Sequence, residues 1–152
     1  MLLFGSQESK YYPFRSRLSK LFGNTNGINF KLVRPSGKYW GKKLSELINQ
    51  SWLTVSTTSV YDYLVCKYFE ISASNSVVLG NLDNIGKTIW NNSDYINIEP
   101  NMSDSQIVKI VKKSLDDKNN LLKIGERMGK KIRDNFSTES YVTKLVEIIR
   151  RR

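Results

Sequence analysis

Short apolar segments alternate along the chain with segments whose apolar residues follow helical spacing. The apolar segments cover residues 2–4, 28–33, 52–55, 76–79 and 95–98, and each is followed within two residues by glycine, serine or proline. Strands separated by helices pair as a parallel sheet covered on both faces, and right-handed crossovers make that sheet doubly wound. The sequence therefore predicts an α/β fold with one Rossmann-like parallel sheet of about five strands.

The last third of the chain is predicted to be a helical tail over residues 103–152. Ser103 and Gln106 form a capping-box pattern at its start, a second helix covers residues 121–132, and Ser137 precedes a third. We find no linker and no internal repeat, and 152 residues is a usual size for one domain. Residues 1–152 are therefore expected to form a single domain.

Residues 60–71 are apolar on two faces of a predicted helix. Val60, Leu64, Tyr68 and Ile71 form one stripe, and a second stripe lies beside it. A helix that is apolar on two sides is usually packed between other elements. We therefore expect this helix, with Cys66, to be buried.

The composition excludes several kinds of site. The chain has one cysteine and no histidine, which excludes a disulfide within the chain, a Cys/His zinc site and acid–base catalysis by histidine. No apolar stretch reaches the ~20 residues that span a bilayer. The first residues lack the basic leader of a signal peptide. We expect a cytoplasmic protein.

The formal net charge of +10 predicts an acidic partner, which could be nucleic acid, a membrane surface or a phosphate-bearing small molecule. The basic residues form no dense block and the aromatic residues occupy core-like positions, so we do not expect a nucleic-acid partner. Residues 101–152 hold 13 basic and 7 acidic side chains, a net of +6. This basic tail could contact a membrane surface peripherally or simply face solvent.

Four polar loops follow predicted strands and would meet at the carboxyl edge of the sheet, where ligands bind in such folds. They are Gly5–Ser6, residues 34–37, Ser56–Ser59 and Gly80–Asn81. Small residues let backbone N–H groups approach a phosphate, although they also serve as ordinary turns. Neither of the standard glycine-rich phosphate signatures occurs.

One segment resembles a known family. Residues 67–79, KYFEISASNSVVL, resemble the (R/K)-x-F-E-x-x-A-x-G-x-x-x-L signature of nucleotide-sugar glycosyltransferases with the GT-B fold, of the family 4-like "group 1" kind. Residues 12–15, YPFR, resemble the Y-P-x-R of this subgroup, and the helix after Ser137 resembles the family's terminal helix, which crosses back to the amino-terminal half. The resemblance covers nearly the whole chain as the carboxyl-terminal, donor-binding half.

The resemblance implies roles for two carboxylates. Glu70 matches the family glutamate that binds the ribose hydroxyls of the nucleotide, and a carboxylate accepts two such O–H bonds well. Asp62 stands eight residues earlier, where the family has a glutamate near the donor sugar, and it is shorter. Asn75 replaces the usual glycine. The alternative for Glu70 is a surface salt bridge.

The resemblance also implies phosphate contacts. Lys67 would contact the diphosphate, or instead pair with Glu70 one helical turn away. Arg15 would contact a phosphate or the sugar, or instead lie on a solvated helix face. Gly5 and Ser6 follow the first strand and would approach the phosphate. Backbone amides would come from the start of the buried helix, at residues Ser59, Val60 and Tyr61.

In this family, the departing nucleoside diphosphate is stabilised electrostatically, and no divalent metal or other cofactor is expected. The function implied is the donor-binding half of a hexosyltransferase, which takes a nucleoside diphosphate sugar such as a UDP or GDP sugar and an unknown acceptor. An amino-terminal acceptor-binding domain or a partner chain would complete it, and we expect the chain to be incomplete for catalysis alone. The alternative is a non-catalytic nucleotide or nucleotide-sugar binding module acting with a partner chain.

Overall fold

The computed structural model describes residues 1–34 and 39–150. Its sheet has five strands, all parallel, in the order β2-β1-β3-β4-β5. This arrangement confirms the α/β, Rossmann-like fold predicted from the alternating segments. The strands are β1 (Leu2–Phe4), β2 (Lys31–Val33), β3 (Leu53–Val55), β4 (Val77–Gly80) and β5 (Ile96–Asn97).

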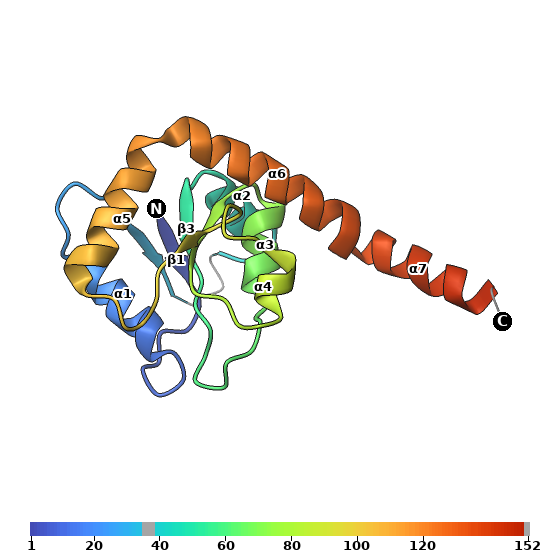
Figure 1. Cartoon of the computed structure of the whole chain (residues 1–152), viewed down its shortest axis with the longest axis horizontal. Helices are drawn as coiled ribbons and strands as arrows, with labels where there is room; N and C mark the ends of the chain where they lie inside the picture. The colour runs from blue at the N-terminus through green and yellow to red at the C-terminus, as the bar shows by residue number, and fades with distance from the viewer. Residues whose placement is uncertain (35–38, 151–152) are drawn as a thin grey trace.

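Helices cover both faces of the sheet, with α1 and α5 on one side and α2, α3 and α4 on the other (Figure 1). Because of this double cover, β1, β3 and β4 are buried along their whole length. The helices are α1 (Pro13–Gly23), α2 (Lys42–Asn49), α3 (Lys67–Ala73), α4 (Gly86–Ile89), α5 (Asp104–Asp116), α6 (Lys118–Phe136) and α7 (Thr138–Arg150).

The strand order reverses between β1 and β3. The chain leaves β1 towards β2 on one side, and β3 pairs with β1 on the other, with Leu3 opposite Leu32 and Val55. The two loops that follow β1 and β3 therefore diverge at the carboxyl edge of the sheet. A crevice opens at such a point in folds of this kind.

The helix predicted over residues 60–71 is much shorter than expected. It begins at Lys67, and Val60 and Tyr61 are exposed in the loop before it. The amide of Val60 donates to the carbonyl of Tyr11 at 2.9 Å, and the amide of Tyr61 donates to Ser59 Oγ at 3.2 Å. These bonds hold the segment as a loop, because a side-chain oxygen competes with helical pairing.

Cys66, immediately before α3, is exposed rather than buried. The apolar run around it therefore predicted its burial wrongly. Tyr68 and Ile71 on α3 are the residues of the run that are fully buried, whereas Leu64, Val65 and Phe69 are partly buried against the core.

The helical tail follows the predicted pattern. Ser103 and Gln106 form the capping box of α5, and Ser137 Oγ accepts from the amide of Ser140 at the start of α7. Helix α7 extends away from the sheet (Figure 1). It has no buried residue and leaves apolar side chains such as Tyr141 and Ile149 exposed. Within residues 1–34 and 39–150, no helix has the length and apolar character needed to cross a membrane.

Asn75, which replaces the family's glycine, occupies the left-handed region with φ 59°. Asparagine tolerates this conformation better than most residues. Its side chain accepts from Arg133 of α6 at 2.9 Å, and a Cβ at Gly125 or Gly129 would overlap Asn75. The turn between α3 and β4 therefore keeps the geometry of a glycine turn and is attached to α6.

Gly80 offers a direct test of the packing between β3 and β4. A Cβ there would overlap the carbonyl oxygen of Ser56, which is backbone and cannot rotate away. We expect Gly80→Ala to lower the free energy of unfolding by about 2 kcal/mol or more, measured by urea denaturation. Gly23→Ala is the matched control, since nothing lies near its Cβ, and it should leave stability equal or slightly higher. Equal stability of the two variants would contradict the close contact between Gly80 and the carbonyl oxygen of Ser56.

Candidate functional site

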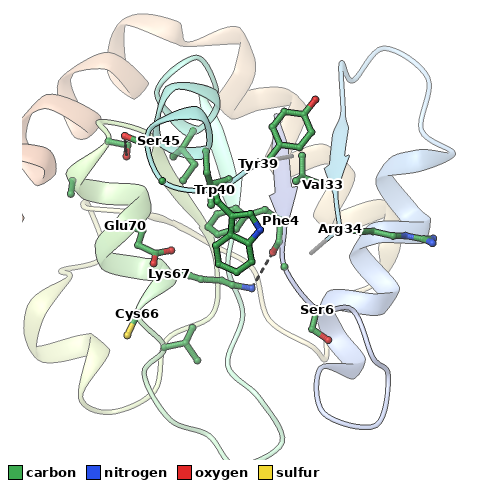
Figure 2. A pocket seen from close by; sticks show the side chains of 17 residues that line it. Phe4, Ser6, Val33, Arg34, Tyr39, Trp40, Ser45, Cys66, Lys67 and Glu70 are labelled. Carbon is green, nitrogen blue, oxygen red and sulfur yellow. Dashed lines mark hydrogen bonds between the residues drawn. The ribbon is translucent and has the colours of Figure 1, made fainter. Parts of the chain in front are cut away.

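A cavity of about 660 Å³ lies at the carboxyl ends of β1 and β2, between α2 and α3 (Figure 2). It opens beside the point where the strand order reverses, where such folds bind ligands. Most of its lining is apolar, with a small number of polar groups. The lining residues are Phe4, Gly5, Ser6, Val33, Arg34, Tyr39, Trp40, Gly41, Leu44, Ser45, Ile48, Val65, Cys66, Lys67, Glu70, Ala73 and Ser74.

Glu70 presents its carboxylate on the α3 wall of this cavity (Figure 2). Its side chain is exposed, and no ion pair joins it to another residue that the structure describes. The surface salt bridge considered as the alternative is therefore not formed within residues 1–34 and 39–150. A carboxylate in this state can accept hydrogen bonds from a ligand.

Lys67 lies one helical turn before Glu70 and crosses towards β1. Its Nζ donates to the carbonyl of Phe4 at 3.1 Å and lies 5.1 Å from the centre of the Phe4 ring. Burial, aided by the charge of the nearby Arg15 and partly opposed by Glu70, lowers the pKa of Lys67 to about 8. The amine therefore changes charge close to neutral pH while facing the cavity.

Gly5 and Ser6 also line the cavity, as the sequence predicted for a loop after β1. Gly5 has φ 89°, and a Cβ there would overlap the Lys67 amine, so glycine is needed for Lys67 to reach Phe4. The amide of Gly5 donates to the carbonyl of Val33 at 3.1 Å. Because that N–H is already bonded to Val33, Gly5 provides the room that the Lys67 amine occupies and not a free hydrogen-bond donor.

Arg15 is almost fully buried, which contradicts the solvated helix face considered for it. Its guanidinium donates to the carbonyl of Ser6 at 3.2 Å and to the carbonyl of Thr57 at 2.9 Å, and it stacks 4.1 Å from the Tyr12 ring centre. Burial lowers its pKa, although Tyr12 opposes this. Arg15 is absent from the cavity lining and joins the loops after β1 and β3.

The remaining predicted residues lie elsewhere along the carboxyl edge. Ser59 and Val60 line a separate cavity of about 280 Å³, whereas Tyr61 and Asp62 line neither cavity. Asp62 lies in the loop before α3 with φ 46°, so it does not share a helix with Glu70. Residues 59–61 were predicted to lie at the start of the helix, and this placement is wrong because α3 starts at Lys67.

The wall opposite Glu70 comes from residues that the sequence did not suggest. Tyr39, Trp40, Leu44 and Ser45 lie there, on α2 or just before it. Trp40 lies at helical spacing from Leu44, which favours a helix that includes it, but α2 begins at Lys42, after Gly41 at φ 54°. Gly41 is the feature of the sequence that could have indicated that the helix begins after Trp40. Of the loop predicted at residues 34–37, Arg34 lines the cavity and residues 35–37 lie outside the described part.

Metal-ligating side chains do not gather at this site. Across residues 1–34 and 39–150, no three histidine, cysteine, aspartate or glutamate side chains lie close enough to hold a metal ion.

Comparisons with known proteins support the fold. No protein-family model matches the sequence, and no curated protein matches it. The crystal structure of TarM, a glycosyltransferase of the GT-B type, is similar to 96% of this chain with a TM-score of 0.64 and 16% sequence identity. The chain covers 34% of the length of TarM. The chain therefore has the fold of a domain of a GT-B glycosyltransferase.

The role of Arg15 can be tested by removing its charge. Arg15→Met leaves the buried carbonyl of Thr57 and the partly buried carbonyl of Ser6 without their donors, so we expect the free energy of unfolding to fall by about 2–4 kcal/mol. Lys20→Met, on the exposed side of the same helix, should change it by less than about 0.5 kcal/mol. Unchanged stability of Arg15→Met in urea denaturation, with loss of nucleotide binding, would make Arg15 a ligand contact instead.

Proposed function

We propose that this chain binds a nucleoside diphosphate sugar in the cavity between α2 and α3, as the donor-binding part of a glycosyltransferase. The observation that carries the proposal is the presence of Glu70 and Lys67 on one wall of a cavity beside the strand-order reversal. A carboxylate and an amine one helical turn apart suit a ribose diol and the phosphate next to it.

The local geometry supports this assignment of roles. Glu70 is exposed and forms no ion pair with the described residues, so its oxygens can accept from two ribose hydroxyls. The absence of a side chain at Gly5 leaves room for the Lys67 amine, which lies at the end of β1 and lines the cavity where a phosphate could reach it. Charge that develops on a departing diphosphate would be stabilised by this amine.

The similarity to a GT-B glycosyltransferase over 96% of the chain supports a role in glycosyl transfer more than a role as a general nucleotide-binding module. Because the chain covers 34% of the length of TarM, we propose that transfer needs an acceptor-binding part beyond these 152 residues. The alternative is a non-catalytic module that binds the nucleotide and acts with a partner chain. Efficient glycosyl transfer by the isolated chain would contradict the need for a further part.

Glu70 provides the main test. We expect at least one of UDP, GDP, ADP and dTDP, or a sugar conjugate of it, to bind in isothermal titration calorimetry. Glu70→Ala should then weaken binding about 10- to 100-fold, because charge-assisted hydrogen bonds are lost. Glu46→Ala is the matched control, since Glu46 is an exposed glutamate on α2 outside the cavity lining. The absence of binding by every nucleotide, or equal binding by Glu70→Ala, would refute the proposal.

Lys67 gives the binding a pH dependence. The free chain carries the Lys67 charge below a pKa of about 8 and loses it above, whereas a bound diphosphate favours the charged form. Affinity for the nucleoside diphosphate should therefore fall as pH rises from 7 to 9, with proton uptake on binding. Lys67→Met should bind more weakly at pH 7 and lose this dependence. If the affinity of Lys67→Met changes with pH in the same way as that of the unaltered chain, Lys67 does not contact the phosphates.

A further inference from the structure

Trp40 is a large aromatic residue on the cavity wall that has little packing of its own. Its side chain is 66% exposed, whereas Trp90 is buried and packs against Tyr68 and Phe69. Among the residues that the structure describes, no ring contact includes Trp40. Exposed aromatic surface that lines a cavity is typical of ligand sites.

The backbone explains why this indole stays outside the core. Gly41 adopts φ 54°, a backbone conformation that residues other than glycine rarely take. Helix α2 starts only after it, at Lys42. Trp40 therefore precedes the helix and cannot join the stripe that buries Ile48. In Figure 2 the indole lies in the middle of the cavity view, with Lys67 below it and Tyr39 above.

The cavity has two chemically different walls. Glu70 and Lys67 supply opposite charges on the α3 wall, whereas Trp40, Leu44 and Ile48 supply apolar surface on the α2 wall. A nucleotide has the same division, since its phosphates and ribose are polar and its base is a flat aromatic ring. Each of its three parts would find a matching group within one cavity.

We propose that Trp40 stacks on the base of the bound nucleotide and forms the nucleobase subsite of this cavity. The inference rests on the proposed function, because it assigns the base of the same nucleotide whose ribose Glu70 binds. Stacking on an aromatic side chain tolerates every base, since each base has a π-face. Trp40 therefore contributes affinity shared by different nucleotides and does not select among them.

The test compares Trp40→Ala, Trp40→Phe and the control Trp52→Phe in the full chain. Trp52 is the other exposed tryptophan, and it lies outside the cavity lining at the opposite end of the sheet. Calorimetry with UDP, GDP, ADP and dTDP should show each binding nucleotide weakened about 5- to 100-fold by Trp40→Ala. Trp40→Phe should retain most of the affinity, and Trp52→Phe should retain all of it.

Two further measurements separate stacking from a structural effect. The indole N–H signal that Trp40→Phe removes from the NMR spectrum should shift when nucleotide is added, because the base ring current acts on it. Binding of inorganic pyrophosphate, which has no base, should be the same in Trp40→Ala and the unaltered chain. If Trp40→Ala weakens pyrophosphate binding as much as it weakens nucleotide binding, the stacking role is overturned.

The outcomes also separate this inference from the proposed function. If the unaltered chain binds a nucleotide through Glu70 and Trp40→Ala binds it equally well, the stacking role is wrong and the proposed function stands. If the unaltered chain binds no nucleotide, the proposed function fails and the stacking role fails with it. Thermal unfolding of Trp40→Ala at an unchanged temperature confirms that the variant is folded, as the exposure of Trp40 predicts.

Discussion

The carboxyl edge of the sheet depends on one buried guanidinium. Arg15 donates to the carbonyls of Ser6 and Thr57, which follow the neighbouring strands β1 and β3 at the point where the strand order reverses. Loops that diverge at such a point have no strand partner to fix them, and the guanidinium supplies two rigid donors in their place. Its charge also lowers the pKa of Lys67 and so extends its influence to the cavity.

The sequence predicted the features that depend on nearby residues. Strand and helix alternation, the capping box at Ser103 and the placement of Lys67 and Glu70 one helical turn apart are all local patterns. The burial of Arg15 could not be predicted this way, because its partner Thr57 lies 42 residues away. The predicted start of α3 was wrong because it also depends on a residue far along the chain. The carbonyl of Tyr11 holds Val60 in a loop despite the helical spacing of Val60.

The net charge of +10 has little to do with the candidate site itself. Lys67 and Arg34 are the basic side chains in the described cavity lining, and Arg15 is buried behind it. Most other basic residues are exposed on helices away from the cavity. A field of this kind acts over about one Debye length and attracts anions to the whole surface, so the cavity must distinguish them by its own groups.

The attachment of Asn75 to α6 has a mechanical meaning. Arg133 bonds both Ala73 and Asn75 at the end of α3, and the glycines of α6 allow the two segments to touch. Helix α3 carries Lys67 and Glu70, so these contacts attach the helix that presents both side chains to the 19 residues of α6. A substitution of Gly125 or Gly129 would therefore disturb the position of α3 from outside the cavity, because neither glycine lines it.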